Sequence, residues 1–164
     1  MSLISIQSDT PDDLDKTFEY PVLPGGKHVF VVANDLELTP VMSDPDSTNM
    51  VIKLEARCQD EDENKGIAVF DNFVIVTNPV TDKQHKTKTI HDAKLAQFVA
   101  ACGVLTMEQL KNNEPFDLAD FKDKVFNAES KVAMEKVYPP ELDATGQPKK
   151  ARKASIKQYL YVTA

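Results

Sequence analysis

The order of the predicted secondary-structure elements constrains the fold of this chain more than any other feature of its sequence. Three segments with strand patterns precede a helix pattern, and two further strand patterns follow it. The strands are expected at residues 28–38, 50–59, 67–77, 124–138 and 156–162, and the helix at residues 89–102. This β-β-β-α-β-β order predicts a mainly β fold, a five-stranded OB-like Greek-key barrel with one main helix between strands 3 and 4.

The clearest patterns belong to one strand and to the helix. In residues 50–59 apolar and polar side chains alternate, which is typical of a strand with one buried face. In residues 89–102 apolar side chains recur at helical spacing. Thr89 is a candidate N-cap and Gly103 a candidate stop for this helix. A second short helical turn is expected at residues 107–111.

Adjacent polar residues interrupt two of the strand patterns. Asn34-Asp35 falls within the first strand and indicates a bulge or a bend. Asp71-Asn72 falls within the third strand and indicates a local irregularity or a polar site. Phe70 and Phe73 point to opposite faces of that strand, and we expect Phe73 in the core and Phe70 on the surface.

The chain divides into an arm and one domain. Residues 1–24 show neither a helical nor a strand periodicity of apolar residues, and they contain three prolines. These features predict a partly mobile N-terminal arm that packs on the barrel or stays free. Residues 25–164 are long enough to form the barrel domain with its own core.

Charge is distributed unevenly along the chain. The formal net charge is −7, which by itself argues against binding a polyanion. Residues 1–20 carry five acids and one base, whereas residues 147–164 carry five bases and no acid. The distribution therefore predicts one basic region on an acidic protein. The alternative is that these bases form a solvated loop without a ligand.

The sequence indicates a cytoplasmic protein without membrane contact. No stretch approaches the ~20 apolar residues of a membrane span, and the N-terminus does not resemble a secretory signal. Cys58 and Cys102 lie in strand and helix patterns, and we expect small buried side chains in a reducing compartment. A disulfide between them is the alternative.

The motifs of the common enzyme classes are missing from the sequence. It contains no Gly-rich phosphate loop, no GxSxG elbow and no HExxH. His28, His85 and His91 are scattered, so we expect surface histidines and no metal. The acidic run at residues 60–64 is expected to be a solvated turn. These observations predict a protein that is not an enzyme and uses no cofactor.

Residues suited to single-stranded nucleic acid are concentrated near the C-terminus. Such binding needs aromatic faces for bases and cations for phosphates. Alternate positions of the last strand, on the face opposite the apparent core face, are occupied by Lys157, Tyr159 and Tyr161. The tyrosines are therefore stacking candidates, with packing on the arm or across a dimer interface as the alternative. The preceding loop, residues 141–155, adds phosphate-binding candidates: Lys149, Lys150, Arg152 and Lys153.

Further candidates lie on earlier strands. Lys53 and Arg57 share the wet face of the second strand, where they either meet phosphates or pair with neighbouring acids such as Glu55. Lys131 lies on the fourth strand. Phe70 is a further candidate for base stacking.

Several runs resemble small phage-encoded single-stranded-DNA-binding proteins. They are NMVIKLEARCQDEDENKGIAVFDNFVIV, KLAQFVAACG, DFKDKVFNAESKVAMEKVY and IKQYL, and the resemblance spans roughly residues 25–162. It implies an OB-fold that coats single-stranded DNA, with little sequence preference, in phage DNA replication or recombination. It also implies a location in the host cell cytoplasm and contact with phage or host replication and recombination proteins.

The chain departs from the family pattern at two places. Asp123 precedes Lys124, where the family tends to have glycine. The C-terminus is basic and aromatic, whereas many members end in an acidic tail that recruits partners. The acidic segment 9–19 could recruit partners instead, or compete with DNA for the basic region.

A second interpretation belongs to another functional class. The chain could be a non-enzymatic phage accessory protein that binds a protein partner through its acidic surface. In either case an open edge on a small barrel would allow a homodimer.

Overall fold

The computed structural model describes residues 2–14, 21–42, 47–137 and 140–162. Parts of the predicted arm, the end of the predicted strand at Tyr138 and the last two residues lie outside these ranges. The strands are β1 (Gly26–Val32), β2 (Leu38–Pro40), β3 (Met50–Cys58), β4 (Ala68–Ile75), β5 (Val125–Lys136) and β6 (Lys150–Leu160). The helices are α1 (Asp82–Ala101) and α2 (Met107–Lys111), with short 3-10 turns at Pro11–Asp13 and Leu118–Phe121.

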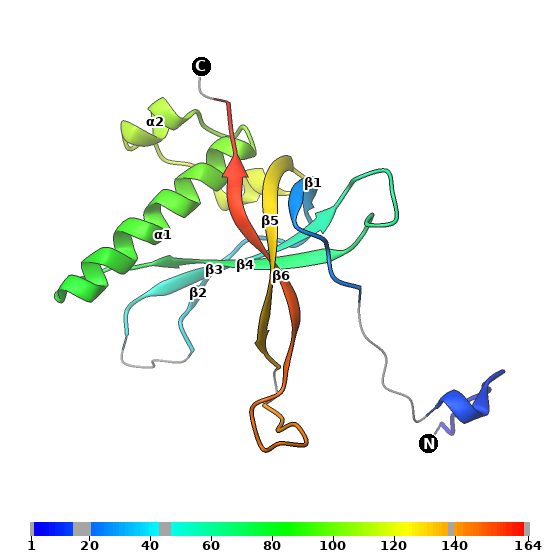
Figure 1. Ribbon diagram of the computed structural model, residues 1–164. Coiled ribbons are helices and arrows are strands. Elements are labelled where there is room, and N and C mark those ends of the chain that lie inside the picture. Colours follow the sequence, from blue (N-terminus) through cyan, green and yellow to red (C-terminus); the bar gives the residue numbers. More distant parts are fainter. Residues whose placement is uncertain (1, 15–20, 43–46, 138–139, 163–164) are drawn as a thin grey trace.

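The predicted mainly β fold is confirmed, but the sheet has six antiparallel strands and not five. β3 pairs with β4 along one edge and with β1 and β2 along the other. β1 also pairs with β5, and β5 with β6. Within the described residues no backbone ladder joins β4 to β6, so the sheet is not closed into the predicted barrel (Figure 1).

The first predicted strand is split because of the side chain of Asn34. Its amide nitrogen donates to the Lys53 carbonyl at 2.8 Å, and its amide oxygen accepts from the Glu55 N–H at 2.8 Å. The Ala33 N–H still donates to the Glu55 carbonyl at 2.9 Å, but the Asn34 side chain takes the place of the backbone carbonyl that would accept from the Glu55 N–H. The main chain leaves the ladder at this point. The predicted bend is confirmed, and the chain rejoins β3 as the short strand β2.

Helix α1 begins seven residues before its predicted start. Thr81 is the N-cap, and Thr81 and Gln84 form a reciprocal capping box. Thr89 lies inside the helix, where its hydroxyl donates to the His85 carbonyl. The first two turns are polar all round, so periodicity could not reveal them. The predicted stop is confirmed, because Gly103 has φ 72° just after the helix.

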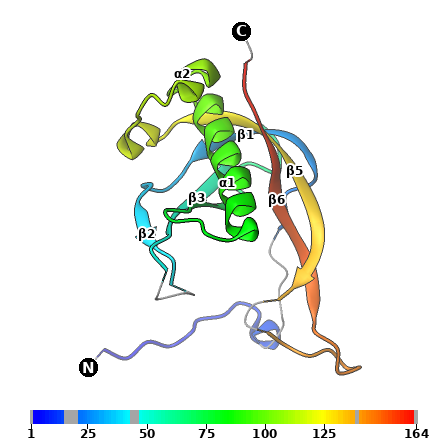
Figure 2. The same cartoon turned by 90° about the vertical axis from the view of Figure 1, so that its left-hand side faces the viewer.

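An aromatic cluster forms the centre of the core. Helix α1 packs against the sheet (Figure 2) and places Phe98, which is fully buried, among aromatic rings. The ring centroids of its neighbours lie 5.1–5.4 Å away and belong to Phe73, Phe121, Phe126 and Tyr159. The predicted burial of both cysteines is also confirmed, and Cys58 and Cys102 are free thiols.

Asp71 forms the polar site that its position in the strand pattern indicated. Its carboxylate accepts from the Tyr159 hydroxyl at 2.6 Å and from the Lys94 ammonium at 2.9 Å. Lys94 also donates to the Asn72 carbonyl at 2.6 Å. Burial, followed by the nearby carboxylate, raises the pKa of Tyr159, so the phenol stays protonated as a donor. Asp71 thereby links β4 to β6 and to α1.

Two of the three histidines are not the solvated side chains that the sequence suggested. The His28 side chain is only 8% exposed and lies against Asp60. His91 is half-buried, and its Nδ1 accepts from the Val74 N–H at 3.1 Å. Burial, followed by the nearby Lys94 charge, lowers the pKa of His91. Only His85 is exposed, as expected.

The Asp71 link predicts the effect of removing one hydroxyl. Tyr159→Phe keeps the aromatic packing but removes a partly buried hydrogen bond to a carboxylate acceptor. We expect the free energy of unfolding to fall by about 1.5–3 kcal/mol in urea titrations. Tyr161→Phe is the control, because no hydrogen bond of its hydroxyl is found within the described residues. Equal losses in the two variants would contradict the assignment.

His91 predicts a pH dependence of stability. Because its folded pKa is lowered, the unfolded chain binds the proton more readily. The stabilisation is complete above the unfolded pKa of about 6.5 and is lost as the pH falls through the folded pKa. In urea unfolding at several pH values, His91→Ala should lose part of the decline below about pH 6.5. His85→Ala should keep it, and a wild-type slope in His91→Ala would refute this account.

Candidate nucleic-acid interface

The outer face of the β3–β4 hairpin gathers three of the predicted binding residues. Phe70 pairs with Glu55 across the two strands. Lys53 and Arg57 lie two residues to either side of Glu55, at positions diagonal to Phe70. Diagonal neighbours in an antiparallel pair are within reach of long side chains. An aromatic ring is therefore flanked by two cations on one surface, which we call the β3–β4 face.

Phe70 is turned outward by its neighbours on β4. Val69 and Phe73 are buried on the core side, and Asp71 contacts Tyr159 there. Strand alternation then places Phe70 on the opposite side, where it is 62% exposed. Both predictions for the phenylalanines are confirmed. Within the described residues, Phe70 is the only phenylalanine or tyrosine whose side chain is mainly exposed.

The two cations of the β3–β4 face differ in their partners. Arg57 has its Nε 3.2 Å from the Glu55 carboxylate, and its Nη1 donates to the Gly66 carbonyl at 3.0 Å. This is the neighbour pairing that we gave as the alternative for Arg57. Lys53 is exposed and makes no ion pair with any described residue. Lys53 is therefore the cation of this face that a ligand could engage most easily.

The second part of the interface is a long hairpin of β5 and β6. Their pairing continues to Lys136↔Lys150, well beyond the core. Residues 131–136 and 150–153 are all exposed, and this segment, the basic ribbon, projects from the sheet (Figure 1). The predicted loop 141–155 was thus wrong for residues 150–155, which are strand. A ribbon exposed on both faces has no apolar period, so its sequence resembles a loop.

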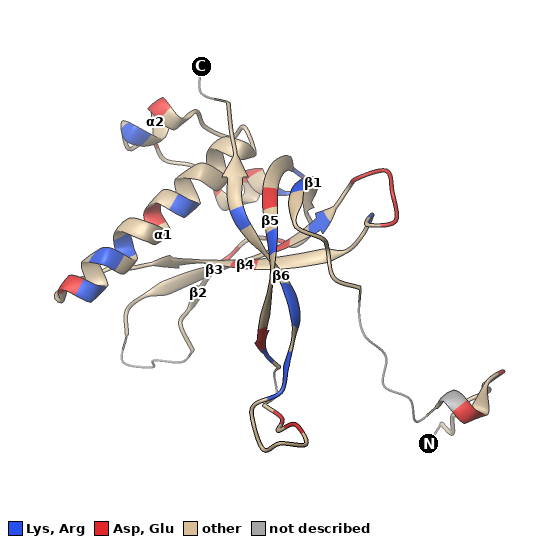
Figure 3. Ribbon diagram, in the orientation of Figure 1, with Lys and Arg blue, Asp and Glu red and all other residues tan. Residues whose placement is uncertain are grey.

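Charges on and beside the ribbon are predominantly positive (Figure 3). Three lysines are paired with acids at 3.4–3.7 Å, namely Lys149 with Glu141, Lys153 with Glu135 and Lys157 with Glu129. Such long, exposed pairs contribute little and exchange readily for other anions. Four cations make no ion pair within the described residues: Lys131, Lys136, Lys150 and Arg152.

A hollow joins the β3–β4 face to the basic ribbon. It has a volume of about 160 Å³ and lies where β4 and β6 approach each other without a ladder. Phe70 lines it from β4, and Arg152 and Lys153 line it from β6. The sequence predicted each of these residues as a binding candidate. It could not show that Phe70 and Arg152, which are 82 positions apart in the chain, line the same hollow.

Residues 21–23 of the predicted arm form another wall of this hollow. Leu23 is fully buried, and the Pro24 carbonyl accepts from the Ser130 hydroxyl at 2.8 Å. The end of the arm therefore packs on the sheet, which was one of the two alternatives. In contrast, Leu3, Ile4 and Ile6 near the start of the arm are at least 79% exposed.

The prediction that Tyr159 stacks a base was wrong. Tyr159 is 1% exposed and belongs to the core. The cause is a β-bulge: Glu129 pairs with Gln158 but Ser130 pairs with Ile156, so Lys157 is an extra residue. The extra residue reverses which side chains face the core. After the bulge, positions that simple alternation places on the surface, such as Tyr159, therefore face the core.

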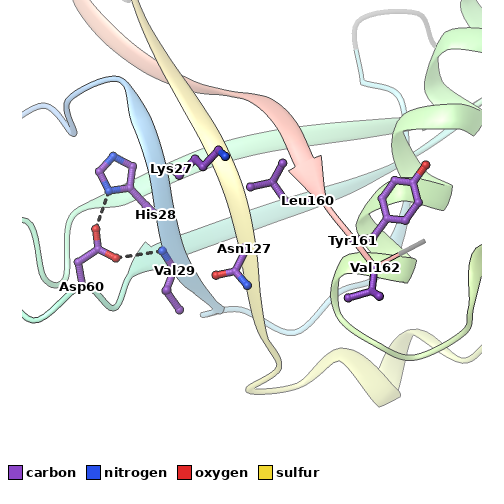
Figure 4. Close-up of a pocket in the computed structure, with 8 residues that line it drawn as sticks. All are labelled: Lys27, His28, Val29, Asp60, Asn127, Leu160, Tyr161 and Val162. Carbon is purple, nitrogen blue, oxygen red and sulfur yellow. Dashed lines mark hydrogen bonds and ion pairs between the residues drawn. The ribbon is translucent and has the colours of Figure 1, made fainter. Parts of the chain in front are cut away.

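Lys157 and Tyr161 do not form a common surface with Tyr159. Lys157 is exposed at the bulge. Tyr161 is half-buried and lines a separate hollow of about 380 Å³ with Lys27, Asn127 and Leu160 (Figure 4). The two hollows share no lining residue, so the structure does not bring Tyr161 to Phe70.

The acidic turn after β3 is only partly the solvated segment that we expected. Glu61, Asp62 and Glu63 are exposed. The Asp60 carboxylate instead accepts from the Val29 N–H at 3.0 Å and lies 2.6 Å from His28 Nδ1. The hydrogen bond from Val29, followed by the contact with His28, lowers the pKa of Asp60. No sequence spacing indicated this contact.

Neither the models of protein families nor the curated proteins include one that matches the chain. Among the described residues, no helix combines the length and the apolar character needed to cross a membrane.

Proposed function

We propose that this protein binds single-stranded DNA with little sequence preference. The observation that carries the proposal is the exposed Phe70 ring, which has Lys53 and Arg57 beside it and Arg152 and Lys153 across the hollow. Aromatic rings stack any base, and cations hold the phosphates on either side of it. The site offers both groups, with no base-specific pocket needed.

The pairing of the strands supports an OB-like fold for this function. β1, β3, β4, β5 and β6 pair as β4-β3-β1-β5-β6, with α1 between β4 and β5. We infer a partly open OB barrel, in which β2 is an addition to the connection between the first two barrel strands. OB-folds bind oligonucleotides on the face of barrel strands 2 and 3, here β3 and β4, and with the loop between the last two strands.

The charge distribution is compatible with a polyanionic ligand despite the net charge of −7. Phosphates would meet the unpaired cations of the ribbon and of the β3–β4 face first. They could also displace the exposed partner of Lys153. Binding should weaken as salt rises, because each phosphate contact releases counterions.

The setting that we propose is phage DNA replication or recombination in the cytoplasm of a host cell. It rests on the resemblance of the sequence runs to phage-encoded single-stranded-DNA-binding proteins. In that setting the protein would coat exposed single strands and meet phage or host replication proteins.

The first test is the fluorescence anisotropy of a labelled oligo-dT, with a duplex of equal length beside it, at low and moderate salt. Tight, salt-sensitive binding to the single strand is expected. Phe70→Ala should weaken it by about 1–3 kcal/mol through the loss of one stacked base. Because Phe70 is mainly exposed, this variant should unfold within about 0.5 kcal/mol of the wild type.

A second test removes charge from the ribbon. Lys150→Ala/Arg152→Ala should lower the affinity for oligo-dT and make its dependence on salt less steep, by roughly 0.7 per lost phosphate contact on logarithmic axes. Lys83→Ala/Lys86→Ala is the matched control, because it removes the same charge from exposed positions of α1.

Equal effects of the two double variants would show a general electrostatic attraction and contradict a defined site. If the wild type does not bind oligo-dT at low salt, the proposed function is wrong. The accessory protein that binds a partner through its acidic surface would then be the better interpretation, with a partner pull-down as the next experiment.

A further inference from the structure

Three side chains of different chemistry converge at one end of the sheet. One ring nitrogen of His28, the Cys58 Sγ and one carboxylate oxygen of Asp60 lie within 4.8 Å of one another, and Nδ1 is the ring nitrogen that faces Asp60. β1 supplies the histidine, and β3 and the following turn supply the other two. The backbone fixes their relative positions, because Phe30 pairs with Cys58 and the Gln59 N–H donates to the Val29 carbonyl at 2.8 Å.

The outer atoms of two of these side chains are held by the backbone. His28 Nε2 lies 2.8 Å from the Pro24 carbonyl, to which it can donate. The second carboxylate oxygen of Asp60 accepts from the Val29 N–H at 3.0 Å. Histidines and carboxylates that bind metals are oriented in this way, with the second atom hydrogen-bonded and the first directed at the ion.

The geometry points to a zinc-type metal site in which His28, Cys58 and Asp60 bind one divalent ion. Nitrogen, thiolate sulfur and carboxylate oxygen are the ligands that Zn²⁺ takes, usually four in a tetrahedron. A thiolate ligand disfavours Mg²⁺ and Ca²⁺, which prefer oxygen. In this proposal the ion, and a water as its fourth ligand, reach the site from the larger hollow, which Asp60 and His28 line and the buried Cys58 does not (Figure 4).

Metal binding must compete with the contacts that these side chains make with one another. His28 Nδ1 lies 2.6 Å from the Asp60 carboxylate, and an ion would displace the proton held between them. The Cys58 thiol would also lose its proton to solvent. Burial raises the pKa of this thiol, but coordination deprotonates a thiol outright. The gain from three metal–ligand bonds must exceed both costs.

Cys102 provides an internal comparison. It is also free and buried, and burial raises the pKa of its thiol to about 12. No second group of three potential ligands is found among the described residues, so Cys102 lacks such partners there.

The test is a titration of the chelator-treated full chain with Co²⁺, a spectroscopic substitute for Zn²⁺. We expect one ion per chain and a thiolate-to-cobalt charge-transfer band that Zn²⁺ removes by displacement. Cys58→Ala should lose the band, and Cys102→Ala should keep it at wild-type intensity. Absence of the band in the wild type, or its persistence in Cys58→Ala, would overturn the proposal.

A second measurement covers the case in which Cys58→Ala does not fold. Asp60→Asn keeps the shape of the side chain and an acceptor for Val29, but removes the charged ligand. Zn²⁺ should raise the melting temperature of the wild type and of Cys102→Ala, and raise that of Asp60→Asn by much less. Equal rises in all three proteins would show binding elsewhere and refute the site. The hollow beside the metal site and the hollow beside Phe70 share no lining residue. A negative result for metal binding would therefore not bear on the proposed DNA binding.

Discussion

The half-buried carboxylate of Asp71 links elements that no backbone ladder joins within the described residues. It accepts from Tyr159 on β6 and from Lys94 on α1, while its own strand, β4, pairs with no described strand other than β3. Even partial removal of a charge from water is costly unless the charge is paired and hydrogen-bonded, and the Asp71 carboxylate meets both conditions. The link fixes the distance between β4 and β6 at one point. Away from that point the two strands remain unpaired, which leaves space for the hollow beside Phe70.

The same arrangement reconciles an acidic protein with a candidate polyanion site. Residues 131–136 and 150–153 lie on a hairpin that projects from the sheet, so their charges act at a distance from most of the acids. At an ionic strength of 0.15 M, electrostatic interactions between exposed charges decay over about 8 Å. The local charge of the ribbon, and not the net charge of the chain, therefore decides which ligand this region attracts.

The sequence was sufficient to predict the elements whose patterns depend on burial. The alternation in β3, the outward Phe70, the inward Phe73 and the bend at Asn34 were all readable, because each follows from local chemistry. Elements without a buried face could not be predicted in this way. The polar start of α1 and the strand residues 150–155 carry no apolar period.

The candidate sites were harder to predict than the strands because they depend on contacts between distant segments. The cations and Phe70 were identified by type, but their meeting across β4 and β6 is a tertiary feature. The bulge at Lys157 moved Tyr159 from the expected surface into the core. The cluster of His28, Cys58 and Asp60 has no recognisable spacing, since it depends on the register between β1 and β3.

The bulge at Lys157 lies close to the junction between two parts of β6 that differ in their packing. On the C-terminal side of the bulge, the Tyr159 side chain must stay directed at Asp71 to keep their hydrogen bond. On the other side, none of the described ribbon residues beyond Ala154 belongs to the core or packs against it. Matched insertions or deletions in the outer parts of β5 and β6 would change the reach of the ribbon without shifting a core side chain. Ribbon length is thus a property that evolution or an engineer could vary, to span longer or shorter stretches of a ligand, at little cost to folding.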